Sequence, residues 1–272
     1  MFANVNGVYH CLLRNVNVAD NDSQNIVING NHMFGRSDAD VKRIDLSVST
    51  TPFIITQFFT TFPNLEVLFG TSWGLERIQN NAFVSAVNLK QLVLGRNPIQ
   101  TLNAEAFRGL GKLTRLSVYD SELTTVNEGA FKSLESVDIL FLSGNKIQSL
   151  PRNVFEPLVN LYFISLADNF LESLHGDTFS NNKLLQQVNL KNNQINSLGS
   201  SFLDNLNYLN YLNMEGNKCA SGEWSLKPRD ELKRILNLCF ENFIDSDVKI
   251  FTFELRGTLL IRDEKGNEIL KL

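Results

Sequence analysis

The chain has 272 residues, of which 43% are hydrophobic and 20% are charged, and its formal net charge is −4 at pH 7. This acidic balance, together with the absence of any run of Lys or Arg, argues against a nucleic acid as the main partner. No stretch of about 18 consecutive apolar residues occurs, so the sequence predicts no membrane insertion for this chain.

The first residues, MFANVNGVYHCLLRN, do not read as a signal peptide. They lack a basic segment followed by an apolar core of about 7 to 15 residues. We therefore expect either a mature fragment that starts from an added Met, or a chain that stays inside the cell.

Residues 1–40 do not follow the pattern of the rest of the chain and are predicted to form an N-terminal cap. Apolar residues alternate within residues 12–18 and again within 25–28, and the turn-forming residues 20–23 separate the two segments. This arrangement predicts a β-hairpin. Asn21 begins the chain's one N-x-S/T triplet, which would be a glycosylation site if the protein is secreted.

From residue 41 the sequence repeats itself every 24 residues without an insertion. The units begin at Val41, Leu65, Leu89, Leu113, Val137, Leu161, Leu185 and Leu209. One unit cannot bury its own apolar stripe, so neighbouring units must stack around a shared core. Positions 3 to 5 of each unit are expected to form a short strand that pairs in parallel with the next. We expect residues 41–217 to form eight units, the last incomplete, in one solenoid.

Two further columns run through the repeats. At position 9, where the chain leaves the strand, an amide side chain is expected to bond unpaired backbone groups, as Asn97, Asn145, Asn169, Asn193 and Asn217. Trp73 holds this position in the second unit and cannot replace the amide, so we expect an irregular turn or a bound water there. Position 19 carries a Phe column that is predicted to be buried, as Phe59, Phe83, Phe107, Phe131, Phe155 and Phe179.

The unit from Leu89 shows the complete pattern, with apolar residues at positions 1, 4, 6, 11 and 14, Asn at 9 and Phe at 19. It resembles the typical extracellular leucine-rich repeat. The resemblance implies an α/β solenoid, a horseshoe with a parallel β-sheet on the concave face. It also implies short irregular or 3-10 convex segments, an N-terminal β cap and a C-terminal helical cap. The segments YHCLLRNVNV, GNKC and LCFENF further resemble secreted leucine-rich repeat proteins of insects, including the mosquito innate-immunity group.

The same resemblance implies that residues 218–244 form a C-terminal cysteine cap in which a disulfide joins Cys219 and Cys239. Residues 228–238 lie between these cysteines and carry helix-opening Pro and acids followed by apolar residues, which predicts a helix over the open core. Two buried free thiols are the alternative. Cys11 is left over, and it either bonds to another chain or is a buried single thiol.

Residues 245–272 are dense in apolar and β-branched residues on both sides of a turn-forming run at 264–267. This pattern predicts a terminal β-hairpin. The hairpin either extends the cap or offers an edge that pairs with another chain.

The residue types that catalysis or metal binding requires are scattered. His10, His32 and His175 lie far apart in the sequence, and no metal-ligand pair, nucleophile motif or Gly-rich phosphate loop occurs. We expect no enzymatic activity, no metal and no cofactor.

Solvent-facing strand positions carry apolar and aromatic side chains where polar ones are usual. Strand alternation sends residues between core positions 4 and 6 out of the core, so these side chains are expected to be exposed on the concave face. Flanking Arg residues complete a predicted ligand-binding site formed by Val67, Phe69, Val93, Arg96, Arg115, Tyr119, Ile139, Phe141, Tyr162 and Phe163. Scattered aromatic residues without a function are the alternative.

The sequence thus favours a secreted or extracellular recognition module without enzymatic activity, in innate immunity or receptor-type signalling, whose partner is a protein ligand or co-receptor. The alternative is a structural or assembly protein. In that case the concave face, Cys11 or the terminal hairpin would mediate a homo- or heterodimer.

Overall fold

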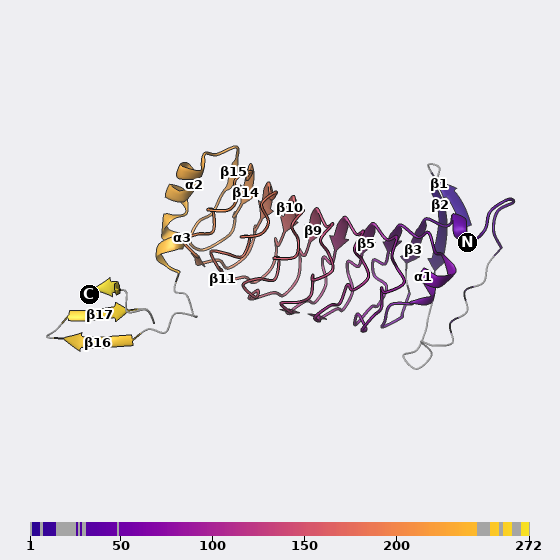
Figure 1. Ribbon diagram of the computed structural model, residues 1–272, viewed down its shortest axis with the longest axis horizontal. Helices are drawn as coiled ribbons and strands as arrows, with labels where there is room; N and C mark the ends of the chain where they lie inside the picture. The colour runs from indigo at the N-terminus through magenta and orange to yellow at the C-terminus, as the bar shows by residue number, and fades with distance from the viewer. Residues whose placement is uncertain are drawn as a thin grey trace.

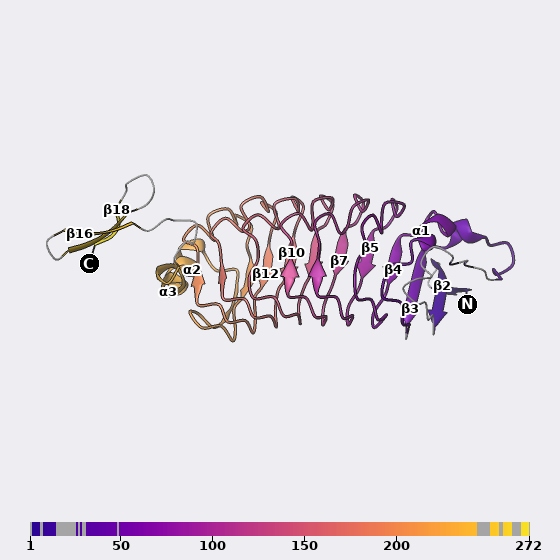
Figure 2. The same ribbon diagram turned by 90° about the horizontal axis from the view of Figure 1, so that it is seen from below.

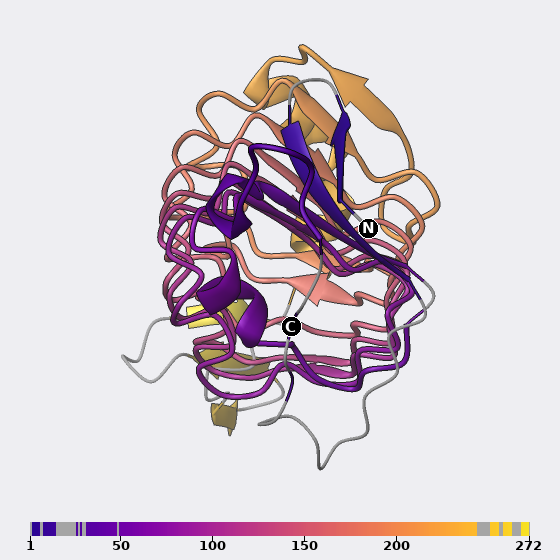
Figure 3. The ribbon, with the colours of Figure 1, turned by 90° about the vertical axis from the view of Figure 1, so that its right-hand side faces the viewer.

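The computed structural model describes residues 2–5, 8–14, 26, 28, 31–47, 49–243, 251–255, 258–262 and 268–271. Each 24-residue unit makes one turn of a solenoid, with its strand on the concave side of a gently curved array (Figure 1). Seen along the array, successive turns lie over one another (Figure 3). The predicted leucine-rich repeat solenoid is confirmed.

The main sheet contains eleven strands, in the order β1-β2-β3-β4-β5-β7-β9-β10-β12-β14-β15. Figure 2 shows the central strands side by side along the array. Their bounds are Phe2–Val5, Val8–Arg14, Arg43–Ser47, Val67–Phe69, Gln91–Val93, Arg115–Ser117, Ile139–Phe141, Phe163–Ser165, Gln187–Asn189, Tyr211–Asn213 and Glu223–Ser225. Pairing is parallel from β2 to β14, whereas β1 and β15 run antiparallel to their neighbours at the two ends.

Most of the remaining solenoid consists of turns, as expected for the convex side. Two small parallel sheets pair β6 (Thr101–Leu102) with β8 (Thr125–Val126), and β11 (Ser173–Leu174) with β13 (Ser197–Leu198). The short helices are η2 (Asp38–Asp40), α1 (Gln57–Thr61), α2 (Arg229–Ile235) and α3 (Asn237–Glu241).

The N-terminal hairpin forms earlier in the chain than the sequence predicted. It consists of β1 and β2, and β2 also pairs in parallel with β3. Every second side chain of β2 faces the core: Tyr9 and Cys11 are buried, and Leu13 packs against the core. Ile26 and Ile28 pack against the same core outside any strand. The predicted turn at residues 20–23, with Asn21, lies outside the described residues.

The C-terminal segment contains three antiparallel strands, β16 (Phe251–Leu255), β17 (Thr258–Arg262) and β18 (Glu268–Lys271). The strands β17 and β18 flank the predicted turn at 264–267, which lies outside the described residues. The strand β16 was not predicted.

The Asn residues at position 9 tie their units to the preceding ones, and Asn97, Asn145, Asn169 and Asn193 are buried while Asn217 is half-buried. In Asn169, for example, Oδ1 accepts a bond from the backbone N–H of Ile147, and Nδ2 donates to the carbonyls of Leu142 and Leu166. The corresponding bonds recur at Asn97, Asn145, Asn193 and Asn217. This is the predicted role of the amide.

The Phe column forms a continuous stack through the core. Neighbouring ring centroids from Phe83 to Phe179 lie 5.5 to 6.2 Å apart, with interplanar angles of 24° or less. Offset stacking at this spacing is a favoured arrangement of aromatic rings. The stack ends on Phe202, whose ring is turned by 65° relative to that of Phe179.

Trp73 stands where the other units carry Asn or Ser at position 9, and the turn there is irregular, as predicted. Its side chain is fully buried. Its backbone N–H donates to Oδ1 of Asn97, and Nε1 has no hydrogen-bond partner among the described residues. Position 8 has a left-handed residue in the second unit, Ser72, as it does in the units that follow. The irregularity is an extra left-handed residue, Gly74, with φ of +77°.

Candidate functional site

The ten residues predicted to bind a ligand lie on or beside the concave strands, but they differ in accessibility. Arg96, Arg115 and Tyr162 are exposed. Six others are half-buried: Val67, Phe69, Tyr119, Ile139, Phe141 and Phe163. Phe69 and Phe141 were expected to be exposed, and the structure shows them half-buried instead.

Val93 does not belong to an accessible face, because its side chain is only 4% exposed. In the register of the sheet it lies between Phe69 and Ser117. Side chains on the inner side of a curved sheet converge, so a small residue beside a large ring is covered even though it points away from the core. The prediction that Val93 contacts a ligand is corrected for this reason.

Phe69 is partly covered by a basic side chain. The guanidinium of Arg43 lies 3.9 Å from the centroid of the Phe69 ring, a cation–π contact. Asp45 fixes Arg43 in this position through a 2.7 Å ion pair. Nδ1 of His10 lies 3.7 Å from the Asp45 carboxylate, and burial, followed by the charge of Arg43, lowers the pKa of His10.

One group of accessible side chains lies on or beside β7, β9 and β10. We call it the central patch, and it consists of Arg115, Ile139, Phe141, Tyr162 and Phe163. The rings of Phe141 and Phe163 lie 5.0 Å apart. Ile139 lies between Arg115 and Phe163 in the sheet register. The patch thus combines two aromatic rings in contact, an aliphatic side chain, and an exposed guanidinium and phenol.

Tyr119 and Arg96 lie at the rim of the sheet rather than in the patch. The Tyr119 ring covers Gly95, where a Cβ would lie 2.4 Å from the ring carbons. Arg96 forms an exposed ion pair with Asp120 at 3.4 Å. Both residues therefore already have partners within the chain.

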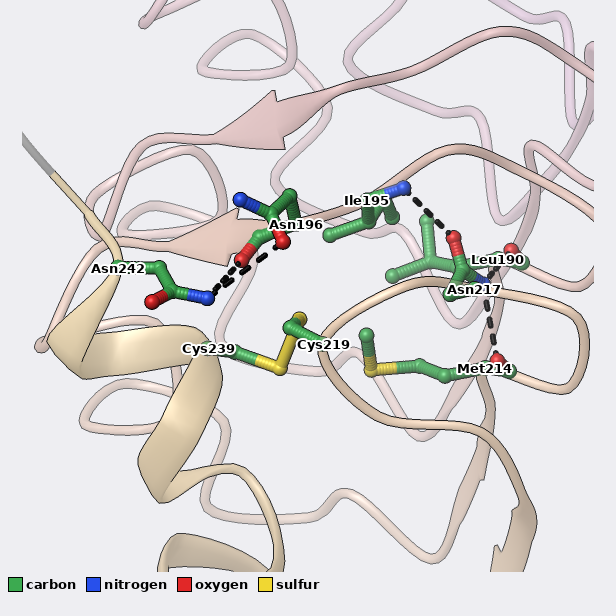
Figure 4. The surroundings of a disulfide bond; sticks show 8 residues. All are labelled: Leu190, Ile195, Asn196, Met214, Asn217, Cys219, Cys239 and Asn242. Atoms are coloured by element: carbon green, nitrogen blue, oxygen red, sulfur yellow. Dashed lines mark hydrogen bonds between the residues drawn. A yellow bond between two sulfur atoms is a disulfide. The ribbon is translucent and has the colours of Figure 1, made fainter.

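At the C-terminal end of the solenoid, a disulfide joins Cys219 and Cys239 (Figure 4). The bond links the last repeat to α3, and Asn242 on the same side donates to the backbone carbonyl of Asn196. Cys11 is a free thiol that is only 2% exposed, and burial raises its pKa. A buried, protonated thiol is a poor nucleophile.

The histidines occupy separate environments. His10 contacts Asp45, the ring of His32 contacts Asp38, and the ring of His175 packs edge-on against Phe243. Within the described part of the chain, no three or more His, Cys, Asp or Glu side chains gather in a way that could hold a metal. No helix in the same part of the chain has the length and apolarity needed to cross a membrane.

A family model for the BspA-type leucine-rich repeat region matches residues 76–210 and 144–252 in six copies, and together these ranges cover more than half of the chain. The chain belongs to this family. No curated protein matches it.

Solved structures with the same fold include the TLR13–ssRNA13 complex, with 26% identity and a TM-score of 0.63 over 68% of this chain and 26% of the other. A second is the leucine-rich repeat protein LIC12759 of Leptospira interrogans, with 26% identity and a TM-score of 0.59 over 74% and 48%. The leucine-rich repeat domain of APL1 shares the fold at 18% identity, with a TM-score of 0.57 over 76% and 63%. The chain spans less than two thirds of the length of each.

Proposed function

We propose that the chain is a non-enzymatic recognition module that binds a protein through its concave sheet. The observation that carries the proposal is the central patch, in which the Phe141 and Phe163 rings are in contact beside an exposed Arg115. Accessible aromatic and Arg side chains, grouped with an apolar residue, are the usual anchors of protein interfaces. The leucine-rich repeat fold supports this role because its curved sheet presents the patch as one extended surface.

A protein suits this surface better than a nucleic acid. The TLR13 structure is a complex with ssRNA13, so RNA is the natural competing ligand. Binding to a phosphate backbone depends on several Lys and Arg side chains acting together. The central patch has a single basic residue, Arg115, and the chain as a whole carries a net charge of −4.

We further propose that the protein acts outside the cell, in innate immunity or receptor-type signalling. The disulfide between Cys219 and Cys239 supports this location, because such bonds persist mainly in oxidising compartments. The similarity to TLR13 and the insect-type flanking segments support the setting.

The alternative role in assembly would use the concave face, Cys11 or the terminal hairpin for dimerisation, and the burial of Cys11 argues against the second of these. Cys11 lies within the sheet on β2, paired with β3, and is buried. An intermolecular disulfide at Cys11 would require this part of the sheet to open.

The test compares a Phe141→Ser/Phe163→Ser variant with a Val84→Ser/Val87→Ser control. The two valines are exposed apolar residues in a turn segment outside the sheet. Each protein is immobilised and used to capture binding proteins from the extracellular fluid of its source, and thermal melting verifies that all variants are folded.

We expect a defined protein to be retained by wild type and control, with at least about tenfold weaker binding to the patch variant. Titration with single-stranded RNA at low and high salt should show no binding. Equal capture by all three proteins, or salt-dependent RNA binding, would contradict the proposal.

A further inference from the structure

The loop between β15 and α2 holds an exposed leucine in an unfavourable backbone conformation. Leu226 is 82% exposed and has a φ of +53°. It is the one apolar residue among the described non-glycine residues with positive φ. A glycine would adopt this conformation without strain, and an exposed side chain adds nothing to the core. Backbone strain retained without a folding benefit is a feature of binding sites.

The three residues that follow this leucine, Lys227, Pro228 and Arg229, line a pocket. It has a volume of about 470 Å³, is lined by Leu206, Leu209 and Leu232, and has Lys227 and Arg229 among its polar residues. Its lining residues come from 203–209 and 227–232. The helix α2 to which Arg229 and Leu232 belong lies at the C-terminal end of the solenoid (Figure 1). Its volume is within the range of pockets that bind ligands.

The apolar surface continues along the edge of the repeats next to the pocket. At position 24 of four of the five earlier units, a polar side chain donates to the carbonyl of the residue 25 places before it, as Asn64, Asn88, Ser136 and Asn160. Leu184 and Tyr208 replace these residues in the next two units, and both are exposed. Tyr208 lies between Asn207 and Leu209, which both line the pocket.

Two basic groups on this surface contact amides instead of carboxylates. Nζ of Lys183 donates to Oδ1 of Asn205, and Arg229 donates to Oδ1 of Asn207. Neither forms an ion pair in the described residues, whereas Lys233 close by is paired with Asp204 at 2.9 Å. Lys183 and Arg229 therefore carry positive charge that no ion pair in the described part of the chain neutralises.

We propose that this end surface, consisting of Leu184, Tyr208, Leu226, Lys183, Arg229 and the pocket, is a second docking site. Its ligand is a protein segment in which an apolar or aromatic side chain is flanked by carboxylates. The apolar side chain enters the pocket beside Leu226, and the carboxylates replace the amide partners of Lys183 and Arg229. Charge-assisted bonds to a carboxylate are stronger than bonds to an amide, which gives the exchange its driving force. This site does not depend on the central patch.

The probe is a labelled synthetic peptide with one central Phe flanked by Glu residues. The control peptide carries Lys in place of each Glu. Fluorescence anisotropy at physiological ionic strength measures the binding of both peptides. We expect saturable binding of the acidic peptide only, and changes in backbone amide chemical shifts confined to residues 183–184, 203–209 and 226–232.

Two variants test the assignment. Leu226→Gly removes the exposed side chain and relieves the backbone, so it should preserve or raise the melting temperature while weakening peptide binding about tenfold. Lys183→Ala should weaken binding several-fold. Its matched control is Lys112→Ala, because Lys112 also donates to an amide oxygen, that of Asn88. The control and the Phe141→Ser/Phe163→Ser variant should bind the peptide as wild type does.

The proposal is overturned if the acidic peptide does not bind saturably, if both peptides bind equally, or if Leu226→Gly and Lys183→Ala keep wild-type affinity. Loss of binding in the Phe141→Ser/Phe163→Ser variant would move the peptide to the concave face. A concentration-dependent dimer in light scattering that Leu226→Gly abolishes would make a second copy of the chain the occupant.

Discussion

The indole ring of Trp73 occupies the space in which a side chain at Gly70 would lie. A Cβ on Gly70 would come within 2.5 Å of Cε3 of Trp73. Position 6, which Gly70 holds, is a buried aliphatic residue in the following units, such as Leu94 and Val118. The second unit therefore exchanges a large residue at position 6 and an amide at position 9 for a glycine and an indole.

This exchange predicts strong coupling between residues 70 and 73. Gly70→Leu alone should lower the free energy of unfolding by about 1 to 3 kcal/mol, because it overpacks the core. Gly70→Leu combined with Trp73→Asn restores the usual pair and should recover most of this loss. Denaturant unfolding of the two single variants and the double variant measures the coupling. Additive effects of the two substitutions would contradict the interpretation.

The repeat architecture could be predicted because one period governs every column. Apolar, Asn and Phe positions recur every 24 residues, so each unit supplies independent evidence for the same fold. The pairing of Gly70 with Trp73 occurs in only one unit, and periodicity cannot reveal it. The glycine at position 6 was the available signal.

The Phe column predicts a large cost for removing one ring. Phe131 is fully buried, and its ring stacks against Phe107 and Phe155 at 6.2 and 5.9 Å. Phe131→Ala should lower the free energy of unfolding by about 3 to 5 kcal/mol. Phe34→Ala is the control, because Phe34 is fully exposed and should change stability little. An unchanged denaturation midpoint for Phe131→Ala would show that the column does not support the core.

Reduction of the disulfide should lower the stability of the C-terminal end. Cys219 and Cys239 are 20 residues apart, and closing a loop of this size stabilises the folded state by about 3 kcal/mol in the chain-entropy model. We expect a Cys219→Ser/Cys239→Ser variant to melt at a lower temperature than wild type, and reductant to lower the melting temperature of wild type alone. Mass spectrometry of unreduced protein should recover the two cysteines in one linked peptide pair. Recovery of both as alkylated thiols would exclude the bond.

The N-terminal end should lose stability in mild acid through His10. Burial lowers the pKa of His10 from 6.5 in the folded state, so the unfolded chain takes up a proton that the folded chain does not. Stability should therefore fall as pH drops below 6.5, until the folded-state pKa is reached. A His10→Gln variant should lack this part of the pH dependence. Unfolding free energies of the two proteins between about pH 7.5 and pH 5.5 provide the test, and parallel curves would exclude His10 as the cause.

The site was harder to predict than the fold, because strand alternation gives the direction of a side chain but not what covers it. Phe69 and Phe141 both point away from the core, yet Arg43 lies over one ring while Phe163 packs against the other. Val93 points the same way and is buried between its neighbours. These outcomes depend on the identities of residues 22 to 26 places away on adjacent strands, which no single unit contains.

The Asn bonds between the repeats have a direction. Each carboxamide accepts from a backbone N–H of the preceding unit and donates to one of that unit's carbonyls, as Asn193 does with Leu171 and Leu166. A repeat is therefore completed by the unit that follows it. During synthesis, which proceeds from the N-terminus, a repeat that precedes one of these Asn residues keeps unsatisfied backbone groups until that Asn has left the ribosome. The last full repeat depends on Asn217, which accepts from Ile195, so the segment that leads into the cysteine cap also completes the final turn of the growing chain.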